Sequence, residues 1–182
     1  MSESSPIKDA LYAKIDGIGQ EQIHQLLLNN KFSELFEIIY EPVIHSVHDM
    51  DEYEKHGTLA ESLTHYLFTE MLIPSQRKIT FENIELDMII PNTTELQKDN
   101  QNTIIIFFVK TSNIAEIKQK IQDLKKLQKD DTKIWIISKS HIEIQQSTYI
   151  TEKESFGKFL KDAQNFIETK KMNKLNIFKT KV

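Results

Sequence analysis

Apolar residues in the first part of the chain recur every three or four positions, which is the period of an α-helix with one buried face. Residues 6–49 show this pattern twice, and the pair Asn29 and Asn30 separates the two predicted helices. Pro42 is expected to end or kink the second helix near Tyr40, because proline cannot donate the hydrogen bond that continues a helix.

A third helix is predicted over residues 51–72, where the same spacing gives one apolar stripe (Ala60, Leu63, Leu67 and Met71). The period then changes to two, which is typical of a strand with one buried face. Residues 78–81 predict a short strand and residues 84–90 a longer one. Residues 92–102 are polar and aperiodic, so they are expected to form a loop.

The rest of the chain alternates buried strands with helices. Residues 104–109 are continuously apolar, as in a strand that is buried on both faces. An amphipathic helix is predicted over residues 113–129, with a stripe that faces the core (Ile114, Ile117, Ile121, Leu124 and Leu127). Residues 133–138 and 142–150 predict two further strands, and residues 152–171 a last helix.

The order of these elements predicts the fold. Strands joined by short turns are antiparallel neighbours, whereas strand, helix and strand in succession form a parallel pair with a right-handed crossover. We therefore expect an α/β fold: a mixed sheet of four to five strands flanked by helices, with an N-terminal helical extension. The extension would cover residues 1–50, the core with its C-terminal helix residues 51–171, and a basic tail residues 172–182.

The composition excludes several kinds of chemistry. The chain has no Cys, which rules out disulfides, thiolate metal sites and Cys nucleophiles. Its four Gly residues form neither of the glycine-rich phosphate-binding patterns. No apolar run approaches the ~20 residues of a membrane helix, and the polar start does not resemble a secretory signal. We therefore expect a cytoplasmic protein without a membrane partner.

The net charge of −4 conceals an asymmetry between the two halves of the chain. Residues 1–95 carry a net charge of −11 and residues 96–182 a net charge of +7. The Lys-rich half could bind an anionic partner, or it could be a solvated surface. Because the chain has 22 Lys and one Arg, contacts with phosphates are expected rather than contacts with base edges.

Two predicted strands and one helix carry the residues with the clearest chemistry. Side chains alternate along a strand, so Glu85 and Asp87 are expected on one face of the first strand. Phe108 and Lys110 share a face of the next one. If these strands pair, Asp87 meets Lys110 at the end of the sheet. Glu61 lies beside the apolar stripe of its helix and can point towards the sheet.

An acid on a helix, an acid on one strand and a Lys at the end of the next resemble the PD-(D/E)XK nuclease superfamily, nearest to its Holliday-junction-resolvase and RecB-like branches. The resemblance covers about residues 57–140. The letters GTLAE at 57–61 are similar to the helical motif of the family. ELDMI at 85–89 resembles its first strand acid, and VKT at 109–111 resembles the end of its (D/E)xK strand.

The resemblance implies a restriction-endonuclease-like core and, if the protein is active, a divalent-metal-dependent phosphodiesterase, an endonuclease. Glu61, Asp87 and Lys110 would be the catalytic residues. Asp87 and Glu61, with Glu85 as a further ligand, would hold Mg²⁺ or Mn²⁺. The metal would activate a water molecule, and Lys110 would stabilise the charge that develops on the phosphate.

The chain departs from the family at one position, because Phe108 stands where the second acid of (D/E)xK is expected. The site thereby loses an anionic ligand. Two substitutes remain open: Glu85 on the same strand as Asp87, and Glu116 on the following helix. The simpler interpretation is that Phe108 is a core residue and that cleavage is absent or feeble.

We therefore expect a nucleic-acid-binding or -processing protein with impaired catalysis. Its partner would be nucleic acid, in the first place DNA, contacted at the phosphates by lysines of the helix after the central strand (Lys118, Lys125, Lys126 and Lys129). The alternative is a non-catalytic structural or regulatory interaction module on the same fold, which could form a homodimer. His45 and His48 could hold zinc together with an acid, or they could belong to a solvated helix end.

Overall fold

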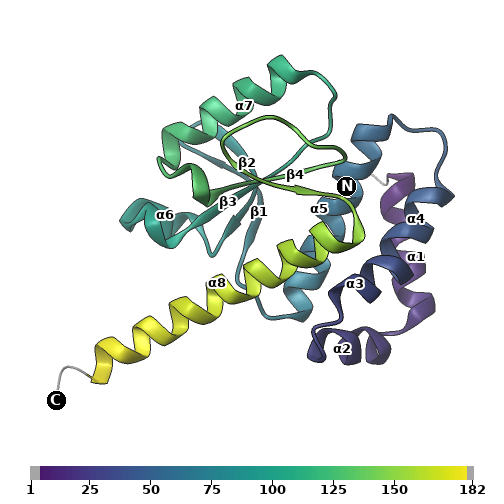
Figure 1. Cartoon of the computed structure of the whole chain (residues 1–182), viewed down its shortest axis with the longest axis horizontal. Coiled ribbons are helices and arrows are strands. Elements are labelled where there is room, and N and C mark those ends of the chain that lie inside the picture. The colour runs from purple at the N-terminus through teal and green to yellow at the C-terminus, as the bar shows by residue number, and fades with distance from the viewer. Residues whose placement is uncertain (1–4, 180–182) are drawn as a thin grey trace.

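The computed structural model describes the backbone of residues 5–179 and the side chains of residues 5–171. It is an α/β fold in which a five-stranded mixed sheet lies between helices, with further helices at the amino-terminal end (Figure 1). The strands are β1 to β5 (Gln76–Phe81, Ile84–Ile90, Ile104–Phe108, Ile134–Ser138 and Ser147–Ile150). The predicted fold class is confirmed.

The strands lie side by side in chain order. β1, β2 and β3 are antiparallel neighbours, whereas β3, β4 and β5 are parallel. The helix α7 (Ile114–Leu127) connects β3 to β4 and provides the crossover that a parallel pair requires. β3 and β4 are buried along their whole length, which explains why both are continuously apolar in sequence.

Five helical segments precede the core: α1, α2, α3, the π-helix η1 and α4 (Pro6–Ile18, Gln20–Leu28, Phe32–Leu35, Phe36–Tyr40 and Glu41–Ser46). The predicted break at Asn29 and Asn30 is present. A further break lies at Gly19, whose φ of 89° is a conformation that glycine adopts readily.

Of the two effects predicted for Pro42, the end of the helix near Tyr40 is absent, and an irregular π-helical turn, η1, directly precedes the proline. Pro42 lies in the first turn of α4, and the helical path continues into it from η1. The amide groups of a first helical turn have no partner within the helix, so proline is tolerated there.

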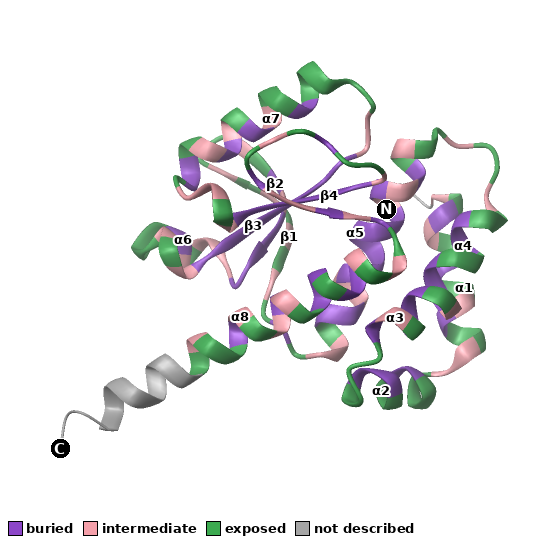
Figure 2. Cartoon of the chain, viewed as in Figure 1, coloured by how far each residue is buried: buried purple, intermediate pink, exposed green. Residues whose placement is uncertain are grey.

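Two apolar cores lie on opposite faces of the sheet (Figure 2). α5 (Glu52–Glu70), the start of α8 (Lys153–Lys179) and the amino-terminal helices cover one face, with Leu63 and Phe159 in its core. α7 covers the other face, with Ile117 and Ile121 in that core. Because helices cover both faces of the sheet, a site for a ligand is expected at the ends of the strands.

Two local predictions fail in the second half of the chain. The predicted loop 92–102 contains the short helix α6 (Thr93–Lys98), because Asn92 accepts a hydrogen bond from the amide of Glu95 and caps it. Ile114 was expected in the core, but it is 48% exposed as the first residue of α7.

The boundary predicted between residues 171 and 172 does not interrupt the last helix. α8 continues through it to Lys179, and residues 180–182 of the predicted tail lie outside the described part of the chain. Within the described residues, none of the helices combines the length and the apolar character needed to cross a membrane.

Candidate functional site

The site lies where α5 crosses the ends of β2 and β3. Gly57 of α5 lies against the end of β3: a Cβ atom added there would lie 2.4 Å from the carbonyl oxygen of Val109 and 2.6 Å from Cγ of Lys110. No other residue type fits without moving the helix or the strand. The close approach made possible by Gly57 brings Glu61, one turn further along α5, next to Lys110.

Glu61 is a buried carboxylate between two cations. Its Oε2 atom lies 2.5 Å from Nζ of Lys110, and its Oε1 atom lies 3.2 Å from Nε of Arg77 on β1. The second contact is an ion pair without hydrogen-bond alignment, because Oε1 has no hydrogen-bond partner. The side chain of Glu61 is only 3% exposed, whereas Lys110 remains one-third exposed and can contact solvent or a ligand.

Asp87 lies at the point where β2 and β3 part. The ladder between these strands extends only as far as the pair Met88 and Ile106. Beyond it, Oδ2 of Asp87 accepts a hydrogen bond of 2.9 Å from the main-chain amide of Phe108. Burial raises the pKa of Asp87 above its ordinary value, and the nearby ammonium of Lys110 and the Phe108 amide oppose that rise.

The alternation of faces along β2 is interrupted at Asp87. Leu86 belongs to the core under α7, whereas Met88, two residues later, belongs to the core under α5. On the neighbouring strand Lys78 has a φ of 50°, and the regular pairing omits the pair of Lys78 and Asp87. The strict alternation that predicted Glu85 and Asp87 on one face therefore does not hold across this point.

A pocket of about 310 Å³ opens beside Asp87 and is also lined by Lys78, Thr80 and Lys110. Phe108 does not line it. Its side chain is only 1% exposed and packs in the core under α5, as the sequence interpretation expected of a core residue. The lining of the pocket therefore combines two lysines with two acids, Asp87 and Glu85.

The two acids considered as substitutes for the missing ligand have other surroundings. Glu85 is exposed at the edge of the same pocket, and its carbonyl oxygen accepts a hydrogen bond of 2.6 Å from Lys120. The Glu116 carboxylate accepts a hydrogen bond of 2.9 Å from Asn113 Nδ2, within the cap that begins α7. Glu116 therefore belongs to the start of a helix rather than to the site.

The donor set does not fit the Mg²⁺ or Mn²⁺ that the resemblance implies. Both oxygens of Glu61 face side-chain cations, and one oxygen of Asp87 is used by the Phe108 amide. Among the described residues, no three His, Cys, Asp or Glu side chains are placed to hold a metal ion. Divalent cations prefer several oxygen ligands, and here both oxygens of Glu61 already face Lys110 and Arg77.

The four lysines predicted to contact nucleic acid lie on or directly after α7 (Lys118, Lys125, Lys126 and Lys129). Lys125 forms an ion pair of 3.0 Å with Asp131. Lys126 forms one of 2.5 Å with Asp123. α7 covers the opposite face of the sheet from α5, so these lysines are not gathered around Glu61.

Three cationic residues near the site were not predicted. Arg77 contacts Glu61, Lys78 lines the pocket, and Lys8 reaches this region from α1. Arg77 is the single Arg of the chain and lies at the start of the first strand. This position was the only sequence signal that could have indicated a cation at the site.

A second polar cluster surrounds the first turns of α5. Nδ1 of His56 lies 2.9 Å from the hydroxyl of Tyr40 and 3.0 Å from that of Thr151. Burial lowers the pKa of His56 to about 4, so its imidazole is neutral at pH 7. Tyr40 belongs to the π-helix η1 and, together with His56 and Thr151, lines a pocket of about 520 Å³.

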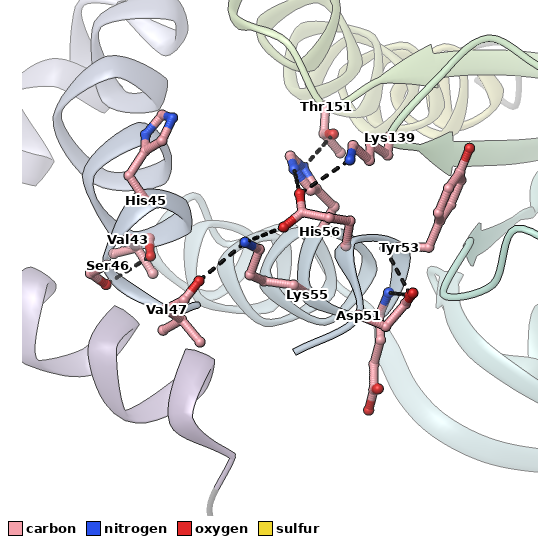
Figure 3. Close-up of polar contacts among 12 residues, drawn as sticks. Val43, His45, Ser46, Val47, Asp51, Tyr53, Lys55, His56, Lys139 and Thr151 are labelled. Atoms are coloured by element: carbon pink, nitrogen blue, oxygen red, sulfur yellow. Dashed lines mark hydrogen bonds and ion pairs between the residues drawn. The ribbon is translucent and has the colours of Figure 1, made fainter. Parts of the chain in front are cut away.

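Figure 3 shows the ion pairs beside this imidazole. Glu52 accepts from Lys55 at 2.5 Å and from Lys139 at 3.1 Å. The buried Lys55 ammonium also donates to the carbonyl oxygen of Val47. These two lysines lower the pKa of Glu52 to about 2. The network fixes the start of α5 against the connection that follows β4.

His45 and His48 line the same pocket but do not form a zinc site. Nδ1 of His45 is 2.7 Å from the carbonyl oxygen of Glu41, and Figure 3 shows His45 on α4, apart from His56. A helix end with solvated imidazoles, the second interpretation of the sequence, agrees with this placement.

No protein-family model, curated protein or solved structure matches the chain. The functional conclusion therefore depends on the geometry of the chain itself.

Proposed function

We propose that the protein binds nucleic acid through a nuclease-like centre in which metal-dependent cleavage has been lost. One observation carries the proposal: Glu61, Asp87 and Lys110 come from a helix and two strands, in the order that the PD-(D/E)XK resemblance implies, and meet at one end of the sheet. The surrounding order of one helix, three antiparallel strands, a helix and a parallel strand supports it. A cytoplasmic location is part of the same proposal.

The chemistry of the centre favours binding over cleavage. Lys110 and Arg77 supply the positive charge that a metal ion would otherwise supply next to a phosphate. Phe108 contributes a main-chain amide to the site but no carboxylate. Without a second anionic ligand, activation of water by Mg²⁺ lacks its structural basis.

Binding and cleavage can be tested separately. We expect the wild-type protein to bind a fluorescent DNA duplex in EDTA, and Lys110→Gln to weaken this binding several-fold, because a phosphate contact is lost. We expect no cleavage of linear or branched DNA with Mg²⁺ or Mn²⁺. If DNA is cut and Asp87→Ala abolishes the cutting, the proposed loss of catalysis is wrong.

A second function, the protein-interaction module, is favoured by the internal pairing of Lys110 with Glu61. In that case the ion pair stabilises the fold and contacts no ligand. This function predicts no binding to DNA or RNA at low salt, and a homodimer would be measured as twice the monomer mass in light scattering.

A further inference from the structure

The amino-terminal helix α1 brings a lysine to the candidate site. Ile7 and Leu11 of α1 are fully buried in the core that also contains Leu63 of α5, so α1 is fixed against α5 (Figure 1). Lys8 lies between these anchors in sequence. It lies near Lys78 and Arg77 of β1 and Glu61 of α5, whose charges act on its ammonium group.

Two ammonium groups that lie near each other repel, and a phosphate placed between them would relieve this repulsion. Burial and the nearby charges of Lys78 and Arg77 lower the pKa of Lys8. The negative charge of Glu61 raises the pKa of Lys8, but Glu61 already pairs with Arg77 and Lys110. The four cations of the cluster therefore exceed the acids beside them by one formal charge, the acids being Glu61, Asp87 and Glu85.

The backbone holds Lys78 in this place. Its φ of 50° is unfavourable for a residue with a side chain and costs about 1 kcal/mol or more. The conformation also interrupts the pairing of β1 with Asp87 and leaves Lys78 exposed beside the pocket that Lys110 lines. Strain of this kind is common where a side chain serves a ligand.

We propose that Lys8, Lys78 and Lys110 form one phosphate-binding track, so that the N-terminal helical extension is part of the nucleic-acid interface. This inference rests on the proposed function. The three lysines come from α1, β1 and the end of β3, and Lys78 connects the other two. Cations in series suit the repeated phosphates of a nucleic-acid backbone, whereas one small anion would contact only part of the series.

The track is an alternative to the lysines of α7. Two of those lysines are already paired with aspartates, and their helix lies on the other face of the sheet. The variants that separate the two surfaces are Lys8→Gln and Lys78→Gln on the track, and Lys118→Gln on α7. Lys14→Gln is the matched control, because Lys14 lies on α1 about 240° around the helix from Lys8.

The test measures the affinity of the full chain for duplex and single-stranded DNA in EDTA, over a series of salt concentrations. We expect Lys8→Gln and Lys78→Gln each to weaken binding several-fold and to reduce the salt slope by about 1. Lys14→Gln and Lys118→Gln should match the wild type. If Lys118→Gln weakens binding and the track variants do not, the inference is wrong while the proposed function stands.

Two further outcomes would also contradict the inference. In a competition experiment at constant ionic strength, millimolar inorganic phosphate and an unlabelled oligonucleotide are each added to the complex with labelled DNA. If phosphate displaces the DNA as effectively as the oligonucleotide does, the lysines form a site for a small anion. If the wild type binds neither DNA nor RNA at low salt, the proposed function fails, and the track fails with it.

Discussion

The carboxylate of Asp87 accepts a hydrogen bond from the main-chain amide of Phe108, the residue that stands where the resembled nucleases carry their second acid. The two positions are thus joined through a main-chain donor. The same contact satisfies an amide that the β2 and β3 ladder leaves without a strand partner. Asp87 therefore has a structural role at the end of the sheet.

Replacement of Asp87 by Asn should stabilise the protein at neutral pH. The raised pKa means that the folded state resists ionisation of Asp87, so its contribution to stability is greatest below the ordinary Asp pKa and is lost as pH rises through the raised value. Asn removes this cost, and its amide oxygen can still accept from Phe108. Urea denaturation should show a higher midpoint for Asp87→Asn at pH 7 and a smaller difference near pH 3. A lower midpoint for Asp87→Asn at pH 7 would contradict the conclusion that the ionised Asp87 destabilises the fold.

Gly57→Ala should destabilise the fold by about 1–3 kcal/mol, because the new methyl group would collide with Val109 and Lys110. Gly17→Ala is the matched control. Its added methyl group meets no atom within 4 Å, and alanine favours a helix over glycine by up to about 1 kcal/mol. A lower midpoint of thermal unfolding for Gly57→Ala and a higher one for Gly17→Ala would support the close approach of α5 and β3. A neutral Gly57→Ala would mean that the two elements are further apart.

Glu61→Gln should separate stability from binding. Loss of the carboxylate leaves Lys110 and Arg77 without their shared counter-ion and should cost about 1–3 kcal/mol of stability. It also releases Lys110, so affinity for DNA should rise. Glu54→Gln, an exposed change of the same charge on the same helix, controls for net charge. Equal affinities of the two variants would show that Glu61 does not restrain Lys110.

The neutral imidazole of His56 predicts a loss of stability in mild acid. Its pKa is about 4 in the folded protein and about 6.5 in an unfolded chain, so the unfolded state binds more protons between these values. The stabilisation is present above pH 6.5 and decreases as pH falls towards 4, by up to about 3 kcal/mol. The free energy of unfolding measured across this window should vary less in His56→Gln. An unchanged pH profile in the variant would assign the acid sensitivity to other groups.

The sequence predicts the sheet better than it predicts the site. Period two over residues 84–90 and the apolar run that begins at Ile104 identify β2 and β3, and pairing of these strands brings Asp87 and Lys110 to one end. The change of face at Asp87 depends on the backbone of Lys78, which periodicity does not register. Lys8 approaches the site only through the packing of α1 on α5, a long-range contact that leaves no local pattern.

The most direct test of the account is the salt dependence of DNA binding by the wild-type chain in EDTA. Each phosphate contact contributes about −0.9 to the slope of log affinity against log salt concentration for duplex DNA. Three lysines on one track predict a slope of about −3. A slope near zero, or no binding at the lowest salt concentration, would contradict the account and leave the internal ion pairs as purely structural contacts.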